Sequence, residues 1–399
     1  MTLRLAITFA CLLLALGCAQ AGAWRLDHLI TTFWCPPPAT DEALARVAAE
    51  HFTLTWVPEQ GLDVAARHGL RAMLHEGLLS PASLDDPDKR AQLDALIARV
   101  KGHPALFAYY ILDEPNASAF PALGRLVAYL RERDPAHLAY INLFPTYANN
   151  DQLGTQGDTV AAYREHLRQF MAVVKPGLVS YDHYHWFKDR DGDQYFLNLA
   201  MIRQAAFDAG VPFLNIIQAS DGEKVWRFPN GAEMRWLVYT TLAYGGRGIS
   251  YFVYWGPPAY RGIYAEGQPT SLLPPVTHLN AEIGALSPAL LALDSLGAYH
   301  TEPLPWGAEA IPATSPVQVS GRGEFVLGLF GSKGQATAFM VVNRSYREPA
   351  SARITLPAGT QGVQEFDRAQ GAWRGYARPA ADAISVRLQP GDGRLFRLR

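Results

Sequence analysis

Between Asp27 and about Asp294, apolar and polar positions alternate between two patterns. Short runs rich in β-branched and aromatic residues are typical of buried strands, and longer segments with apolar residues every three or four positions are typical of amphipathic helices. The predicted strands cover residues 28–34, 52–57, 70–75, 106–112, 138–143, 178–184, 213–218 and 248–255. The predicted helices cover residues 41–50, 62–68, 87–101, 119–132, 159–174, 194–209, 232–244 and 276–293.

Eight strand–helix units over roughly 270 residues match the length of one (β/α)₈ TIM barrel. The competing α/β architecture, a doubly wound open sheet, normally carries a glycine-rich phosphate-binding turn after its first strand. Here the first predicted strand runs into Trp34-Cys35-Pro36-Pro37-Pro38, and no Walker or dinucleotide fingerprint occurs in the chain. We therefore predict a (β/α)₈ barrel over residues 24–297.

The pattern changes after Tyr299, where helical periodicity ends. Alternating apolar and polar runs separated by turn residues follow, for example "FVLGLFG" from Phe325 and "ATAFMVVNRS" from Ala336. Further runs begin at Ala352 and Ile384. Such a series predicts an antiparallel β-sandwich over residues 298–399, packed on the barrel.

The first residues predict export. Arg4 is followed by an apolar run, residues 5–16, that is too short to span a bilayer, and small residues ending at Ala23 then form an Ala-x-Ala cleavage site. Residues 1–23 therefore read as a signal peptide of a secreted or periplasmic protein without a transmembrane segment in its mature chain. The alternative is a lipoprotein anchored at Cys18, although Ala15 stands where the lipobox usually has Leu.

Composition narrows the choice of partners. The chain has 399 residues, of which 49% are hydrophobic and 18% charged, with a net charge of −2. This balance provides no basic surface for nucleic acid or an anionic membrane. Aromatic residues are abundant, with 9 Trp and 18 Tyr. We expect most of them in the core and some as platforms for the flat apolar face of a sugar.

Candidate functional residues follow from the carboxyl ends of the strands, which form the working face of a barrel. Polar, ionisable and aromatic residues stand at these ends: Trp34; Trp56 and Glu59; His75 and Glu76; Asp113 and Glu114; Asn142; Asp182 to Trp186; Gln218, Asp221 and Glu223; Tyr254 and Trp255. Several carboxylates among aromatic residues suggest carbohydrate chemistry, in which two carboxyl groups flank the bond to be broken. His75, His183 and His185 have no recognised metal-ligand spacing, so we expect neither a metal ion nor a cofactor.

The fourth predicted strand ends in "YYILDEPN", residues 109–116. This ending resembles the Asn-Glu-Pro signature of the clan of retaining (β/α)₈ glycosidases that includes cellulase- and β-galactosidase-like enzymes. The resemblance implies that Glu114 is the general acid/base. It also implies roles for His183 or His185 with Tyr184 on the sixth strand and for Trp255 after the eighth. Substrate-binding residues are predicted to be Trp34, His75, Glu76, Asp113, Asn142, His183, Tyr184, Gln218 and Trp255.

The chain departs from the clan at two positions. Asp113 replaces the Asn that donates a hydrogen bond to a sugar hydroxyl, and Gln218 stands on the seventh strand where the clan has its nucleophilic Glu. Asp182 is one candidate for a second catalytic carboxylate, because a gap to Glu114 of roughly 6.5–9.5 Å would suit an inverting enzyme. Asp221 or Glu223 could instead reach the site from the loop after the seventh strand and support retention.

We therefore predict an exported glycoside hydrolase that acts on a polysaccharide or oligosaccharide through Glu114 and Asp182. Two alternatives stay open from the sequence. Gln218 favours a barrel that binds carbohydrate without cleaving it, and a His or Tyr base would suit a polysaccharide lyase.

Overall fold

A computed structural model describes residues 24–258, 260–377 and 382–399. The predicted signal peptide and the possible lipid anchor at Cys18 lie outside these ranges. Among the described residues, no helix combines the length and apolar character needed to cross a membrane.

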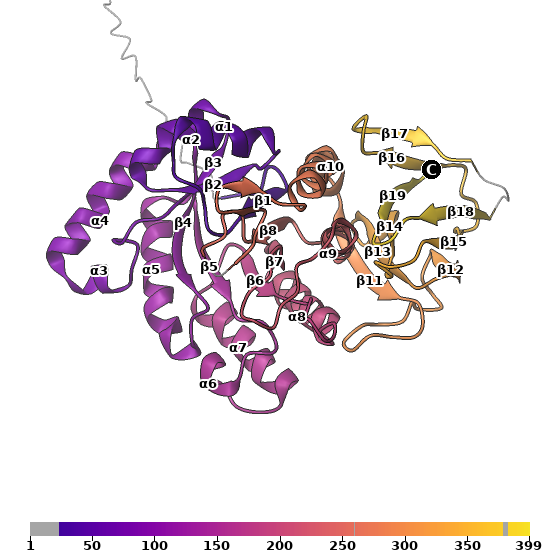
Figure 1. Cartoon of the computed structure of the whole chain (residues 1–399). Helices are drawn as coiled ribbons and strands as arrows, with labels where there is room; N and C mark the ends of the chain where they lie inside the picture. Colours follow the sequence, from indigo (N-terminus) through magenta and orange to yellow (C-terminus); the bar gives the residue numbers. More distant parts are fainter. Residues whose placement is uncertain (1–23, 259, 378–381) are drawn as a thin grey trace, which may run out of the picture.

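Eight parallel strands form the barrel in the spatial order β1-β8-β7-β6-β5-β4-β3-β2. Strands β1 and β2 complete the ring, where the Thr53 backbone N–H donates to the Thr31 carbonyl at 3.0 Å. Figure 1 shows the helices around the outside of this ring. The strands are β1 (Ile30–Phe33), β2 (Leu54–Val57), β3 (Arg71–Leu74), β4 (Leu106–Asp113), β5 (Leu138–Leu143), β6 (Val179–His183), β7 (Phe213–Gln218) and β8 (Gly248–Phe252).

Each predicted helix is present, and its ends lie within three residues of the prediction. The eight are α1 (Asp41–Ala49), α2 (Leu62–Arg67), α4 (Pro87–Val100), α5 (Phe120–Arg133), α7 (Thr159–Val173), α8 (Tyr195–Asp208), α9 (Gly231–Ala243) and α10 (Leu273–Leu291). The sequence analysis missed the short elements in the connecting loops: η1 (Glu59–Gly61), α3 (Ala82–Asp85), η2 (Ala117–Ala119), α6 (Asn150–Leu153) and the hairpin of β9 (Tyr264–Ala265) with β10 (Gln268–Pro269). The predicted (β/α)₈ fold is confirmed.

Capping residues explain where several helices begin. Asp86 accepts hydrogen bonds from the Asp88 and Lys89 backbone N–H groups at the start of α4, and Pro87 occupies the first turn. Asn230 and Glu233 form a capping box at the start of α9. These side chains satisfy donors that would otherwise lack partners in the first turn of each helix.

Two antiparallel sheets make up the C-terminal sandwich, shown in yellow and orange in Figure 1. The larger has the order β11-β13-β14-β19-β16-β17 and the smaller β12-β15-β18. The chain enters the larger sheet at Asp294, a few residues before the predicted domain start at 298. The strands are β11 (Asp294–His300), β12 (Gln318–Arg322), β13 (Phe325–Ser332), β14 (Gln335–Asn343), β15 (Ala350–Thr355), β16 (Val363–Asp367), β17 (Ala372–Gly375), β18 (Ala383–Leu388) and β19 (Gly393–Leu398).

Strand β13 serves two cores through its alternating side chains. Phe325 and Leu327 point into the core between the two sheets, whereas Val326 and Phe330 join the core of the barrel. Strand β13 of the larger sheet is therefore buried on both faces, and through it the sandwich makes an apolar contact with the barrel.

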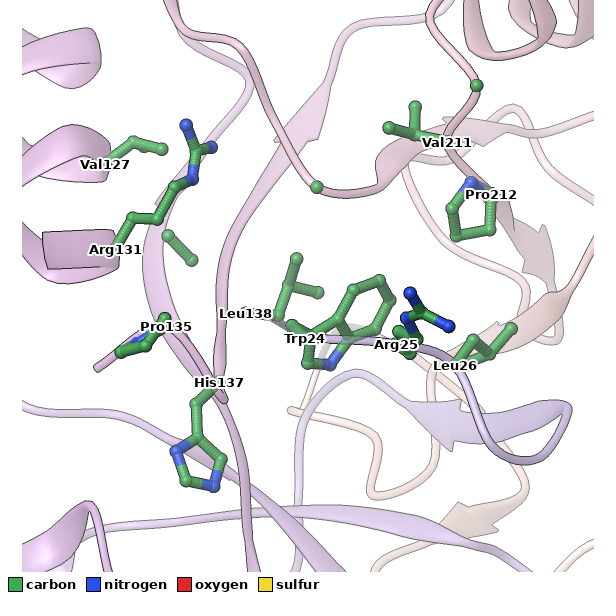
Figure 2. Close-up of a pocket in the computed structure, with 13 residues that line it drawn as sticks. Trp24, Arg25, Leu26, Val127, Arg131, Pro135, His137, Leu138, Val211 and Pro212 are labelled. Carbon is green, nitrogen blue, oxygen red and sulfur yellow. The ribbon is translucent and has the colours of Figure 1, made fainter. Parts of the chain in front are cut away.

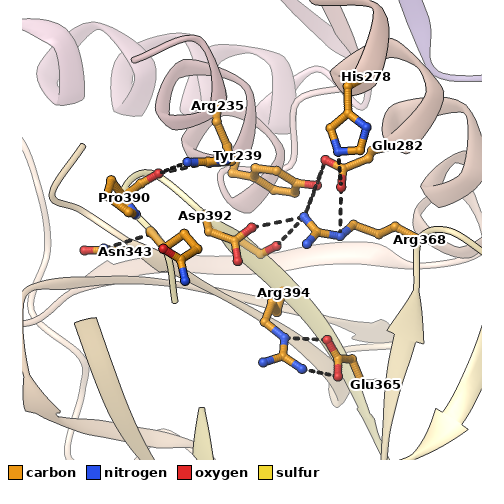
Figure 3. A network of polar contacts seen from close by, with 12 residues as sticks. Arg235, Tyr239, His278, Glu282, Asn343, Glu365, Arg368, Pro390, Asp392 and Arg394 are labelled. Atoms are coloured by element: carbon orange, nitrogen blue, oxygen red, sulfur yellow. Dashed lines mark hydrogen bonds and ion pairs between the residues drawn. The ribbon is translucent and has the colours of Figure 1, made fainter. Parts of the chain in front are cut away.

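Helix α9 packs directly on this sheet, against β13, β14 and β19. The Trp236 indole N–H donates to the Arg344 carbonyl at 2.7 Å, and Gly328 lies so close to α9 that an added Cβ would come within 2.3 Å of the Ala243 carbonyl oxygen. Figure 3 shows the polar part of the contact, in which Arg368 forms ion pairs with Glu282 of α10 at 3.3 Å and with Asp392 at 3.1 Å. Close backbone packing and buried ion pairs together fix the orientation of the sandwich.

Replacing Trp236 with Ala tests how much this contact contributes to the stability of the protein. The side chain is 3% exposed and packs against aromatic residues of the barrel, so its removal should lower the free energy of unfolding by about 3–5 kcal/mol. Chemical denaturation measures the change. Trp306→Ala is the matched control, because Trp306 is 46% exposed and its loss should change stability by less than about 0.5 kcal/mol. Equal changes in the free energy of unfolding for the two substitutions would show that the contact of Trp236 does not stabilise the protein as proposed.

Candidate active site

The end of β4 presents two consecutive carboxylates to the same side. Normally, neighbouring residues of a strand point to opposite faces. Here the pairing of β4 with β5 shifts between Tyr110 and Leu112, so that Asp113 pairs with Asn142. Glu114 then adopts a left-handed backbone conformation with φ of 44°. The bulge and the left-handed residue change the direction of the backbone, so that both side chains lie on one side. An apolar strand can therefore end in two acids without placing either of them in the core.

The amide of Asn142 connects the acids of β4 with the acid of β6. Its Nδ2 donates to Asp113 Oδ1 at 3.0 Å and to Asp182 Oδ1 at 2.9 Å, while its Oδ1 accepts from Ser180 Oγ at 3.0 Å. Ser180 in turn shares a hydrogen bond of 2.7 Å with the Tyr140 hydroxyl. Strands β4, β5 and β6 thus contribute to one side-chain network at the carboxyl end of the barrel.

Glu114 and Asp182 are joined directly by a side-chain hydrogen bond. The expected wide gap of an inverting pair is therefore wrong, because Asn142 draws Asp182 toward β4. Burial and the neighbouring Asp113 raise the pKa of Glu114 to about 7. Burial, followed by the charges of Glu114 and Asp113, raises the pKa of Asp182 well above its usual range. The raised pKa favours the protonated form of Asp182, which is 3% exposed, and in that form its carboxyl group can donate to Glu114.

Aromatic residues line the barrel beside these acids. Tyr110 lies 5.0 Å from Trp56 and 6.0 Å from Trp34 between ring centroids, and the two indoles are 4.9 Å apart. The exposed His75 ring meets the edge of Tyr110 at 5.2 Å. Among the described residues, the indole N–H groups of Trp34 and Trp56 have no acceptor. These four side chains form what we call the aromatic floor.

The residues at the end of β6 have different surroundings: Tyr184 lies on the side of the acids, whereas His183 and His185 are buried. Tyr184 lies near Asp182 and Glu114 and packs on Trp226 at 4.6 Å and on Phe252 at 5.0 Å. His183 is bound to Asn198 Oδ1 at 3.0 Å, and burial lowers its pKa to about 4. His185 stacks on Trp236 at 5.0 Å in the interior. Both histidines are neutral, and His185 belongs to the core.

Gln218 is buried at the end of β7 and is fully engaged by backbone groups. Its Oε1 accepts from the Trp186 N–H at 2.7 Å, and its Nε2 donates to the carbonyls of Trp186, Ser220 and Arg227 at 3.1–3.2 Å. The amide therefore ties together the loops after β6 and β7. This arrangement gives Gln218 a structural role in place of the predicted contact with substrate.

Other predicted residues lie away from the acids or are engaged elsewhere. The Glu76 carboxylate accepts from the Glu59 N–H at 2.8 Å, and Asp221 forms an ion pair with Arg261 at 3.0 Å. Glu223 accepts a hydrogen bond from the Tyr260 hydroxyl. Trp255 stacks on Tyr264, with 5.6 Å between ring centroids, in the loop after β8. Asp221 and Glu223 thus hold the loops of the rim together.

Two features of the rim were missed by the sequence analysis. Tyr147, in the loop after β5, is 42% exposed, and its hydroxyl accepts from the Tyr184 N–H at 3.2 Å. Asp191, in the loop after β6, binds Arg227 and Arg347 at 3.2 Å each and accepts from the Tyr346 hydroxyl. Because Tyr346 and Arg347 follow β14, the sandwich contacts the rim directly. Neither residue stands in a sequence motif, so only the folded chain reveals its place.

A separate cavity of about 370 Å³ lies at the opposite, amino-terminal end of the strands. Trp24, His137, Leu138 and Pro212 line it with neighbouring residues, as Figure 2 shows. It contains no carboxylate and lies at the wrong end of the barrel for the acids of β4 and β6. Within the described residues, no three His, Cys, Asp or Glu side chains are grouped so as to hold a metal ion.

No protein-family model matches the chain, and no curated protein matches it by sequence. Solved structures, in contrast, resemble the chain in their fold. A β-galactosidase from the psychrophilic Marinomonas ef1 aligns with 93% of this chain and 100% of its own at 9% identity, with a TM-score of 0.51. This chain therefore shares its fold with a glycoside hydrolase. An endo-1,4-β-mannanase from Eisenia fetida aligns at 13% identity with 65% of this chain and 94% of its own, with a TM-score of 0.42.

The raised pKa of Asp182 predicts an unusual pH dependence of stability. The unfolded chain releases this proton from about pH 4, whereas the folded chain retains it to a higher pH, so stability falls as pH rises between the two pKa values. Asp182→Asn keeps an acceptor for Asn142 and a donor for Glu114 without an ionisable group. Its melting temperature relative to the unchanged protein should therefore be higher at pH 8 than at pH 4, since each unit of raised pKa is worth about 1.4 kcal/mol. A difference that is independent of pH, measured by differential scanning calorimetry, would show that Asp182 is ionised in the folded state.

Proposed function

We propose that the protein is an exported glycoside hydrolase in which Glu114 is the general acid/base. The observation that carries this proposal is the position of Glu114, at the carboxyl end of β4, with a pKa near 7 among two further acids. A carboxylic acid that holds its proton near neutral pH can give it to a leaving oxygen. The fold shared with a β-galactosidase is consistent with this role but does not assign it.

The surroundings of Glu114 support the chemistry. Asp182 donates a hydrogen bond that steadies the Glu114 carboxylate after it has lost its proton, while the charge of Asp113 favours the protonated form beforehand. Asn142 holds both aspartates in place. The acid therefore sits between one neighbour that raises its pKa and one that limits the rise.

The aromatic floor supports a carbohydrate as the substrate. Sugar rings present apolar C–H faces that stack on aromatic side chains, and their hydroxyl groups bind the polar groups between them. Tyr110 is half-buried near Asp113, the half-buried Trp34 packs against Tyr110, and Tyr184 flanks the acids from β6. A substrate that lies on the floor would bring its glycosidic oxygen to Glu114.

Glu114→Gln tests the assignment. Loss of a positioned general acid should lower turnover of an unactivated glycan by roughly 10²- to 10⁴-fold, while binding measured by calorimetry changes little. Glu223→Gln is the matched control, because Glu223 is a rim carboxylate bound to Tyr260. Near-normal turnover by the Glu114 variant would refute the role. Products with new reducing ends indicate hydrolysis, whereas an ultraviolet-absorbing unsaturated uronide would indicate a lyase, and binding without products would indicate a carbohydrate-binding protein.

The pH profile provides an independent test. If Glu114 must be protonated in the free enzyme, kcat/KM should fall on the alkaline side with an apparent pKa near 7. Steady-state rates from pH 4 to 9 measure this limb. An alkaline limb above pH 9 would assign the proton donor to another group.

A further inference from the structure

We propose that Trp226, in the loop after β7, is a sugar-stacking residue, and that Gln218 is the positioning residue that holds its loop in place. This inference rests on the proposed hydrolase function. It adds a second platform for the substrate, which must then contain at least two sugar rings.

Four aromatic residues form a second group at the carboxyl ends of the strands, which we call the aromatic wall. Tyr184 follows β6, Trp226 lies between β7 and α9, Phe252 ends β8, and Tyr260 lies in the loop after β8. The Trp226 ring is 4.6 Å from Tyr184 and 6.3 Å from both Phe252 and Tyr260 between centroids. All four side chains are half-buried. Aromatic surface that stays uncovered at the working end of a barrel is typical of a ligand contact.

The wall and the floor border the same acids from different strands. The floor comes from β1 to β4, and its Tyr110 lies near Asp113. The wall comes from β6 to β8, and its Tyr184 lies near Asp113 and Glu114. Among the described residues, no ring contact joins the wall to the floor. Two separate platforms suit two sugar rings, with the oxygen that links them at Glu114.

The side-chain amide of Gln218 closes the loop that carries Trp226. Its Nε2 donates to the Ser220 and Arg227 carbonyls at 3.1 and 3.2 Å, one on each side of Trp226 in the chain. Its Oε1 accepts from the Trp186 N–H at 2.7 Å, which ties the same loop to the end of β6. A glutamate could not take this place in its ionised form, because a carboxylate has no hydrogen to give to the carbonyls.

The loop after β8 supports the Trp226 loop from its other side. The Arg261 N–H donates to Asp221 Oδ1 at 2.9 Å, and the two side chains form an ion pair at 3.0 Å. Gly222 packs on Tyr260 so closely that an added Cβ would come within 2.3 Å of the ring. Trp226 is therefore held in place before a ligand arrives, which lowers the entropic cost of binding.

The experiment compares Trp226→Ala with Trp373→Ala, the change of a half-buried tryptophan that packs on Phe366 in the sandwich. The probes are the β-1,4-linked hexaoses of glucose, mannose and xylose and the β-1,3-linked hexaose of glucose. On a hexaose that the unchanged protein cleaves, Trp226→Ala should raise KM about 10- to 100-fold, with a smaller effect on kcat because Glu114 keeps its position. Trp226→Phe should recover most of the loss, and Trp373→Ala should leave KM unchanged.

Binding gives a second measurement that does not depend on turnover. In the Glu114→Gln background, calorimetry should show the same rise in Kd for Trp226→Ala and none for Trp373→Ala. The methyl glycoside of the same sugar has no second ring, so the unchanged protein should cleave it with a kcat/KM roughly 100-fold lower than that of the hexaose.

Gln218→Ala and Gln218→Glu test the positioning role. Both remove the donor to the carbonyls, so both should raise KM at least about 5-fold by loosening the loop. Adding Trp226→Ala should then cause little further loss, because the two residues act through the same contact with substrate. Gln218→Glu should also form no covalent adduct with a 2-deoxy-2-fluoro glycoside, since its carboxylate would not face the sugar. If the Gln218 variants do not fold, the Trp226 series decides.

The outcomes separate the two proposals. An unchanged KM and Kd in Trp226→Ala, equal kcat/KM for the methyl glycoside and the hexaose, full additivity of the Gln218 and Trp226 substitutions, or a covalent adduct in Gln218→Glu would overturn this inference and leave the hydrolase function standing. Failure to cleave any hexaose of the panel would overturn both.

Discussion

The hydrogen bonds from one amide group, that of Asn142, determine the arrangement of the candidate site. An amide nitrogen has two hydrogens, and here each binds an acid from a different strand. The shared donor brings Asp113 and Asp182 close enough that they and Glu114 cannot all be ionised at low cost. The proton affinity of Glu114 is thus a property of three strands together, and it depends on a neutral residue that carries no charge itself.

The barrel was predictable because its signals are local. Each strand and helix carries its own periodicity, and the carboxyl ends of the strands place Asp113, Glu114, Asn142 and Asp182 on one face before any contact is known. The distance between Glu114 and Asp182 was not predictable. It depends on the bulge at Ile111 and on the hydrogen bonds of Asn142, and neither feature has a signature in the chain.

Gln218 and the histidines illustrate a second limit. In sequence, a polar residue at the end of a barrel strand is equally compatible with a ligand contact and with an internal hydrogen bond. The structure places Gln218 and His185 in the interior, where backbone carbonyls and the Trp236 ring contact them. Burial decides between the two roles, and burial depends on loops that have no regular pattern.

The contact of Asp191 with Tyr346 and Arg347 ties the sandwich to the loop that follows β6 at the rim of the barrel. Insertions or deletions after β14 would then disturb the loop after β6, although they lie in another domain. During divergence of such proteins, the two domains would have to be inherited as one piece. Exchange of the sandwich between relatives would break this contact without altering a single residue of the barrel.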